Sequence, residues 1–461
     1  MIRLFRVSIP SSVVALVLSE SALIITCYVV AAYLTLDISA DIFLIDDGGL
    51  WHVGLVTAVI VLGLYFHDLY DNTRIRSRIL LMQQYCLVLG VAFLLQALLS
   101  YGKWDIILPK WMMVYGSLMV LVLAPAWRLV FTGAVWKALG AQKILFLGSS
   151  SAVQQVARRL KDRPELGLAP IGFVANEDSV GLLNVPHLGS LTDLEQVVAA
   201  QHPDRIVVGL LERRGVLPVE QLLHLRFAGV HIEDVAVTYE SVFGRVSTKD
   251  LRPSQLIFSE EMGPQPRHVM AQSVYSWVLG VIGVILSSPI MLIVAILVKL
   301  SSPGPVFYRQ KRVGLRGAPF VLYKFRSMRQ DAEAATGAVW ATKDDPRITP
   351  LGRWLRKLRL DELPQLLNVI RGEMSLVGPR PERPEFIGIL AEKIPYYQQR
   401  HSVKPGITGW AQINHKYGDT LEDSIIKLEF DLYYIKNLAP SLDAYIVFHT
   451  IKTVLLGRGA Q

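Results

Sequence analysis

An adjacent acid pair, Asp361 and Glu362, is the part of this sequence whose residue types could most directly do chemistry. Apolar residues recur at helical spacing just after it, so we expect a helix that Asp361 caps, with Pro364 in the first turn. At the positive end of a helix, one carboxylate could attack a phosphorus atom while its neighbour holds Mg²⁺. The alternative from spacing alone is that the two acids are simply a favourable helix cap.

A strongly basic stretch precedes the acid pair. From Lys299 to Arg359 the sequence holds fourteen Lys or Arg and four Asp or Glu. Two short β-like pieces, 306–308 and 320–325, lie between glycine and proline turns, and Lys324 and Arg326 lie close to these turns. Cations on turns and short strands can converge on a polyphosphate. The alternatives are a solvated face and a collar that faces lipid head groups.

The elements that would position these groups include long apolar runs. Hydrophobic residues make up 52% of the 461 residues, and four runs near bilayer-crossing length open the chain. We therefore predict a four-span transmembrane bundle over residues 1–136. Loop charges place both of its ends in the cytoplasm. The charges that decide this are Arg3 and Arg6 before the first run, Asp37, Asp41, Asp46 and Asp47 after it, Arg74, Arg76 and Arg78 after the second, and Arg128, Lys137 and Lys143 after the fourth.

A fifth apolar run covers 274–298 and has basic residues on both flanks. Pro289 lacks a backbone N–H and breaks helices, and the Ser288 hydroxyl can bond a carbonyl that the proline frees. Symmetric basic flanks suit a segment that enters and leaves the membrane on the cytoplasmic side. We therefore expect a re-entrant hairpin with its break at Ser288 and Pro289. An ordinary span with a proline kink is the alternative.

The segment 141–262 alternates strand-like and helix-like stretches, which predicts a Rossmann-like, doubly wound parallel domain. Its first turn has one glycine where a dinucleotide fingerprint has three. A degenerate, regulatory or structural domain is therefore favoured over a nucleotide-binding one. No Tyr-x-x-x-Lys pair occurs in the sequence, which argues against an NAD-dependent sugar-modifying enzyme.

Other classes fit the composition poorly. The net charge of +8 suits anionic lipid and phosphate-bearing ligands. No zinc finger, RNP motif or basic helix with interleaved aromatics supports a nucleic-acid partner. The only two cysteines, Cys27 and Cys86, lie in apolar runs and allow no zinc-ligand spacing.

Six ordered blocks in the C-terminal part resemble the large monotopic phosphoglycosyl transferases, which are bacterial polyprenyl-phosphate sugar-phosphate transferases. The blocks are 301–310, Gly314, 323–328, 360–365, 372–381 and 404–413. The resemblance implies a mainly α catalytic domain at 267–461, with the membrane hairpin inside it. The four spans and the degenerate doubly wound domain also match larger members of that family.

The resemblance also implies a reaction and its site. Asp361 would attack the sugar-bearing phosphate of a UDP-sugar, release UMP and form a phosphosugar-aspartyl intermediate. Polyprenyl phosphate, expected to be undecaprenyl phosphate, would then take the phosphosugar and so start exopolysaccharide, capsule or O-antigen assembly. Glu362 would bind Mg²⁺, and Lys324, Arg326 and Arg380 are the candidate phosphate and nucleotide contacts.

The resemblance leaves several points open. The sugar is undecided, with UDP-glucose or UDP-galactose expected from the family. A homodimer through the middle domain is one option for the oligomeric state. The expected location is the cytoplasmic face of a bacterial inner membrane. The alternative function is a non-catalytic membrane scaffold or regulator of polysaccharide assembly.

Overall fold

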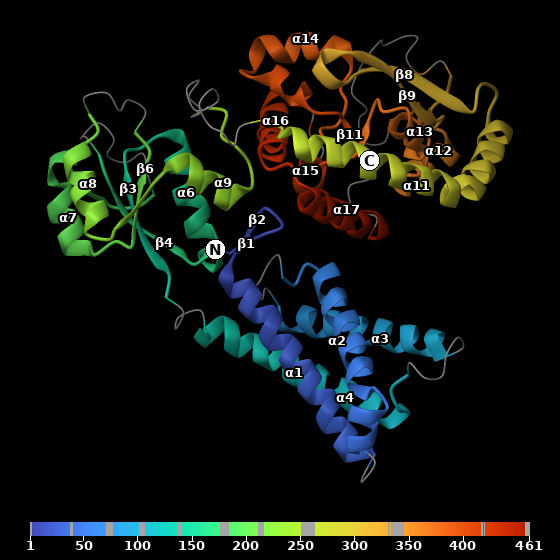
Figure 1. The fold of residues 1–461 in the computed structure, drawn as a ribbon, viewed down its shortest axis with the longest axis horizontal. Coiled ribbons are helices and arrows are strands. Elements are labelled where there is room, and N and C mark those ends of the chain that lie inside the picture. Colours follow the sequence, from blue (N-terminus) through green and yellow to red (C-terminus); the bar gives the residue numbers. More distant parts are fainter. Residues whose placement is uncertain are drawn as a thin grey trace.

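The computed structural model shows three bodies along the chain, which are four apolar helices, a parallel sheet with helices, and a mainly helical C-terminal part (Figure 1). The residues that the structure describes are 2–36, 40–70, 77–100, 107–135, 140–175, 184–210, 216–249, 263–330, 332, 345–415, 418 and 420–456. Asp37, Arg74, Arg76 and Lys137, on which the orientation partly rests, lie outside these ranges, as does the predicted end of the middle domain.

The first body consists of four helices that pack around one apolar core. They are α1 (Ser11–Thr35), α2 (Gly49–Phe66), α3 (Arg78–Ser100) and α4 (Lys110–Val130), with π-helical turns at Ile42–Asp46 and Phe131–Val135. Buried Glu20 on α1 accepts hydrogen bonds from Arg128 on α4, from Tyr70 and from Tyr85. This polar junction fixes the helices against one another, because a charge left unpaired inside an apolar body is costly.

The described residues include five helices long and apolar enough to cross a membrane, which are α1 to α4 and α11 (Pro266–Ser301). Their outer faces expose large apolar side chains, among them Leu18, Leu94, Leu118, Leu286 and Leu292. Apolar faces of this extent need a lipid environment. The protein is therefore a membrane protein, as the sequence predicts.

The middle body is a five-stranded parallel sheet in the order β5-β4-β3-β6-β7. Its strands are β3 (Gln142–Leu147), β4 (Leu168–Val174), β5 (His187–Gly189), β6 (Arg205–Val208) and β7 (His231–Asp234). Its helices are α6 (Ser151–Asp162), α7 (Leu194–Gln201), α8 (Val219–Phe227) and α9 (Val235–Phe243). α6 and α9 cover one face of the sheet, while α7 and α8 cover the other. The predicted doubly wound parallel sheet is confirmed.

The C-terminal part begins with α11 and continues through an antiparallel hairpin and several short helices. Its strands are β8 (Phe307–Val313), β9 (Pro319–Phe325), β10 (Ser375–Val377) and β11 (Gly406–Thr408). Its helices after α11 are α12 (Pro350–Lys357), α13 (Gln365–Ile370), α14 (Pro384–Lys393), α15 (Trp410–Asn414), α16 (Leu421–Lys436) and α17 (Pro440–Leu455). β8 pairs with β9, and β10 pairs in parallel with β11.

The helix α11 runs through Ser288 and Pro289 without the break that the sequence predicts. The Ser288 hydroxyl donates to Ile285 O at 2.8 Å, and this carbonyl is the one that Pro289 leaves without its helical donor. The predicted role of Ser288 is thus confirmed, and it explains why the helix continues. Figure 1 shows α11 changing direction along its course, as expected of a helix that contains proline.

Contacts across the three bodies hold them together. The N-terminal hairpin, β1 (Ile2–Leu4) and β2 (Val7–Ile9), lies against α16, where the Tyr433 hydroxyl donates to Arg6 O at 2.8 Å. Lys452 on α17 pairs with Asp68 after α2 at 2.7 Å. Glu429 on α16 accepts from the amide of Thr248, beyond the sheet, at 3.0 Å. The start of α1 and the end of α2 therefore both face the C-terminal part.

Candidate functional site

Local pairing brings the acid pair beside the β8–β9 hairpin. Asn368 on α13 is fully buried, and its amide donates to Val321 O at 2.7 Å and accepts from Tyr323 N at 3.2 Å. Since these backbone groups belong to β9, the bonds fix α13 and the turn before it against that strand. Sequence reasoning missed Asn368, because a lone Asn in an apolar helix gives no sign of its partner.

The acid pair lies on a 3₁₀ turn, Leu360–Glu362, that precedes the helix. Arg359 before it adopts a left-handed conformation with φ of 53°, which turns the chain sharply at the end of α12. α13 starts only at Gln365, its N-cap is Pro364, and it is six residues long. The predicted capping by Asp361 is therefore wrong, and side-chain cations, not a helix end, surround the carboxylates.

Three cations surround the Glu362 carboxylate, which is buried. Its Oε1 accepts from Lys324 Nζ at 2.8 Å and from Arg380 Nη2 at 3.0 Å, and its Oε2 lies 3.5 Å from Arg359 Nη1. Burial by itself would raise the pKa of Glu362, but these three cations hold that pKa well below its usual range. Glu362 is therefore ionised throughout the physiological pH range.

The Asp361 carboxylate has a different environment. It is 7% exposed, and no hydrogen bond reaches its side chain from the part of the chain that the structure describes. Burial raises the pKa of Asp361, an effect that Lys324 opposes and Glu362 reinforces. Neighbouring carboxylates thus have different properties, since one is a fixed anion held by cations and the other has a raised pKa and no bound donor.

Of the three predicted phosphate contacts, the structure brings two to the acid pair. Lys324 and Arg380 both donate to Glu362, and burial lowers the pKa of Lys324 while Glu362 opposes that shift. Arg326 is placed elsewhere. Its guanidinium donates to Pro303 O at 2.8 Å, Ser302 O at 2.7 Å and Val298 O at 3.2 Å. It binds the carbonyls at the end of α11, which a helix terminus leaves unpaired.

Arg380 belongs to a loop that starts where two segments of the backbone, 378–379 and 404–408, cross closely. A Cβ on Gly378 would lie 2.4 Å from Lys404 O, and a Cβ on Gly406 would lie 2.1 Å from Gly378 N. Only glycine fits at either position. Gly378 N donates to Thr408 O at 2.9 Å, and Gly406 N donates to Pro379 O at 3.0 Å. The two glycine-containing blocks of the sequence thus form one unit that presents Arg380 to Glu362.

The carboxylates of Asp361 and Glu362 suit Mg²⁺ only if a bound substrate contributes oxygen atoms of its own. The described residues contain no group of three or more His, Cys, Asp or Glu able to hold a metal ion. Mg²⁺ commonly binds one or two carboxylates together with substrate phosphates. Asp361 and Glu362 fit that mode and do not form an all-protein cage.

The turn after β3 fits a bound nucleotide poorly. Ser150 N donates to Gly209 O at 3.3 Å, and the Ser150 hydroxyl accepts from Val153 N at 3.4 Å. A Cβ on Gly148 would lie 2.8 Å from Gly209 O. The Ser150 amide and hydroxyl, which lie where a dinucleotide-binding turn would hold a diphosphate, therefore already form hydrogen bonds within the protein, where β3 and β6 meet.

Comparison with known proteins identifies the family. Residues 267–457 match the family model "Bacterial sugar transferase", and residues 65–215 match "CoA-binding domain". An exopolysaccharide production protein of Rhizobium leguminosarum bv. phaseoli is 43% identical over 181 residues, which cover 37% of this chain and 89% of that protein. The chain belongs to the bacterial sugar transferase family. The six sequence blocks that resemble polyprenyl-phosphate sugar-phosphate transferases lie within the residues that match this family.

Two relatives that are longer than the Rhizobium protein extend the similarity of this chain towards its N-terminus. An Aeromonas hydrophila UDP-N-acetylgalactosamine-undecaprenyl-phosphate N-acetylgalactosaminephosphotransferase is 42% identical over 280 residues, 61% of this chain and 63% of the relative. A Xanthomonas campestris pv. campestris UDP-glucose:undecaprenyl-phosphate glucose-1-phosphate transferase is 34% identical over 324 residues, 68% of this chain and 66% of the relative. The matched part is thus less than two thirds of each relative's length.

Proposed function

We propose that this protein transfers a sugar phosphate from a UDP-sugar to undecaprenyl phosphate. Its family membership and the activities for which its relatives are named support this class of reaction. The observation that carries the mechanism is the unequal acid pair, in which Glu362 is held by cations and Asp361 accepts no hydrogen bond from the described residues. A scaffold without catalytic activity would not need this difference, and the relatives do not favour it.

In the first step, an Asp361 oxygen attacks the sugar-bearing phosphorus of the UDP-sugar. A new bond forms between that oxygen and phosphorus, and the bond from phosphorus to the bridging oxygen of the diphosphate breaks. UMP leaves with the bonding electron pair. A nucleophile without bound donors retains its lone pairs for attack, and its raised pKa makes it the more basic member of the pair.

In the second step, a phosphate oxygen of the lipid attacks the same phosphorus atom. The bond to Asp361 breaks, the carboxylate is regenerated and the lipid-linked sugar diphosphate is released. Two transfers through one carboxylate let a soluble donor and a lipid acceptor use the same site in turn. Lys324 and Arg380 would stabilise the charge on the transferring group. Mg²⁺, with Glu362 as its proposed protein ligand, would supply further charge neutralisation.

We infer that α11 is re-entrant and that the site lies at the cytoplasmic membrane surface. Gln272 near its start donates to Asp443 at 2.7 Å, and Val298 near its end accepts from Arg326. Both ends of α11 therefore lie on the same C-terminal part, while its middle exposes apolar side chains to lipid. Cysteine labelling at Glu422, in a chain with Cys27 and Cys86 replaced, is expected from the cytoplasmic side. Labelling from the periplasm would show that α11 crosses the membrane.

A screen of donor sugars tests the proposed function. The relatives use UDP-glucose and UDP-N-acetylgalactosamine, so the screen starts with these two and adds UDP-galactose. Purified protein in lipid nanodiscs with undecaprenyl phosphate and Mg²⁺ is expected to release UMP and form a lipid product from at least one donor. The Asp361→Asn variant is expected to lose both. Near-normal UMP release by that variant would refute the nucleophile assignment.

A further inference from the structure

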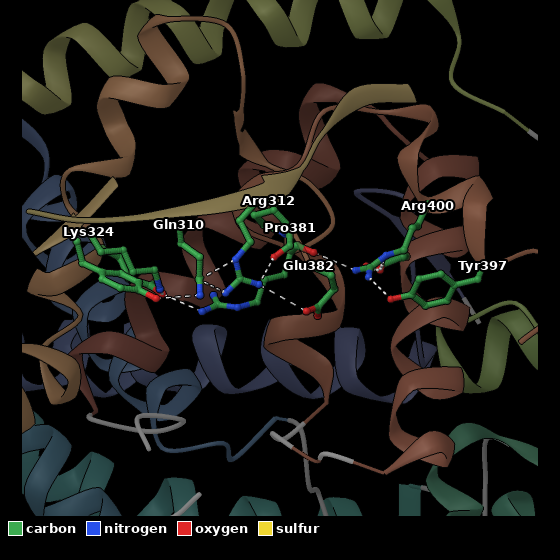
Figure 2. A network of polar contacts seen from close by, with 11 residues as sticks. Gln310, Arg312, Lys324, Pro381, Glu382, Tyr397 and Arg400 are labelled. Carbon is green, nitrogen blue, oxygen red and sulfur yellow. Dashed lines mark hydrogen bonds and ion pairs between the residues drawn. The ribbon is translucent and has the colours of Figure 1, made fainter. Parts of the chain in front are cut away.

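Two arginines, the buried Arg400 and the partly buried Arg312, hold the backbone of the loop that carries Arg380. Arg400 Nη2 donates to Arg380 O at 3.0 Å, and Arg312 Nη1 donates to Pro381 O at 3.0 Å. Figure 2 shows both guanidinium groups directed at this loop, with Lys324 of the acid-pair site at the other end of the network. Consecutive carbonyls are thus held from two different elements, β8 and the 3₁₀ segment 397–402.

Both arginines are themselves fixed. Arg400 is 6% exposed and bonds Asp431 Oδ2 at 2.8 Å and the Tyr397 hydroxyl at 2.7 Å. Arg312 donates from Nε and Nη2 to Gln310 Oε1, at 3.0 and 2.7 Å. A guanidinium group has donors in a rigid planar fork, so each arginine can hold its anchor and the loop carbonyl at once. The loop therefore has little freedom to shift.

We propose that Arg400 is a positioning residue that acts through Arg380, with Tyr397 and Asp431 as its anchors and Arg312 as a second support. This inference rests on the proposed function, because Arg380 is there a contact for the transferring phosphate. The Arg380 side chain reaches Glu362 at 3.0 Å, so a shift of its backbone would change that contact directly. Sub-ångström placement of a charge at a reacting phosphate has large kinetic effects.

A double-mutant cycle tests the proposal in the full chain. Arg400→Lys keeps the charge but loses the fork, and it is expected to lower kcat/KM for UMP release by about tenfold. In the Arg380→Ala background, the same change is expected to lower the rate by less than about twofold, since the group it positions is already gone. Tyr397→Phe, which removes a single hydroxyl, is expected to show a smaller effect with the same dependence on Arg380.

The dissociation constant for UDP in the presence of Mg²⁺ is measured for the same set of variants. Low activity of Arg380→Ala therefore does not prevent the test. Arg226→Lys is the matched control, because Arg226 also donates to a carbonyl, Ile232 O at 2.9 Å, but in the middle body. Equal losses from Arg400→Lys with and without Arg380 would overturn the proposal and assign Arg400 a general folding role. A wild-type protein without UMP release would instead overturn the proposed function, and the UDP affinities would still decide the positioning role.

Discussion

Replacing Glu362 with Gln should destabilise the C-terminal part, because it leaves three cations without their shared anion. Lys324, Arg380 and Arg359 lie 2.8, 3.0 and 3.5 Å from its carboxylate oxygens. Removing one partner of a buried ion pair costs about 3–5 kcal/mol. The three cations have 18 to 29% of their side-chain surface exposed, so screening by water reduces this to about 2 kcal/mol.

Thermal unfolding in nanodiscs without nucleotide or Mg²⁺ measures this loss. For a unit of roughly 200 residues, about 2 kcal/mol corresponds to a fall in Tm of about 4–8 °C. Glu240→Gln is the comparison variant, since Glu240 pairs with Lys436 at 2.9 Å and its side chain is 17% exposed. We expect a smaller fall for this variant, because the Glu240 carboxylate is more exposed than that of Glu362, so water compensates more of the loss.

A second variant separates electrostatics from packing. Lys324→Met should cost less than Glu362→Gln, since Glu362 keeps two cations. The double variant Glu362→Gln with Lys324→Met should be more stable than the sum of the single losses predicts, by about 1 kcal/mol, because contacting charges are coupled. Strictly additive losses in Tm would refute the description of Glu362 as the shared anion of this cluster.

Three further predictions concern pH and the membrane. The acid limb of the pH profile of UMP release should lie above 3.8, the ordinary pKa of an Asp such as Asp361. Lys324→Met should move this limb to higher pH, since Lys324 lowers the pKa of Asp361. An acid limb unchanged by this substitution would contradict Asp361 as the nucleophile. Burial, aided by Arg400, lowers the pKa of His401 to about 4. The unfolded chain therefore binds more protons than the folded one below pH 6.5, and the free energy of unfolding falls as pH drops from 6.5 towards 4. His401→Gln should flatten that fall in a series of Tm measurements, and an equally steep fall would show that other groups cause it. Trp354 on α12 is 64% exposed, so we expect it to lie against lipid head groups. Brominated lipids should then quench a component of tryptophan fluorescence that is present in the wild type and absent from Trp354→Phe. Equal quenching of the wild type and the variant would place α12 away from the membrane.

Much of the architecture follows from patterns within single segments. Long apolar runs predict α1 to α4 because each helix needs only its own residues to satisfy its backbone. β3, β4 and β6 are continuous apolar stretches typical of a buried parallel sheet. β5 and β7 give no such signal, because each is only three or four residues long and is partly polar, so pairing with neighbours defines it.

The site was predictable in its residue types but not in its arrangement. The sequence blocks point to Asp361, Glu362, Lys324 and Arg380, and the structure brings these four together. The sequence gives no sign that Arg326 binds the carbonyls at the end of α11, because that contact depends on where the hairpin β8–β9 meets the helix. The opposite pKa shifts of the two neighbouring carboxylates also depend on cations that come from three separate segments.

The contact between the N-terminal hairpin and α16 has a consequence for synthesis of the protein. The partners Arg6 and Tyr433 are 427 residues apart. At about 5–20 residues per second, the ribosome needs roughly 20–90 s to reach α16 after the hairpin is made. During that interval α1 can insert into the membrane, but the hairpin has no α16 to pack against. Closure of the three bodies is therefore a late event, and chains truncated before α16 should expose the hairpin to proteolysis.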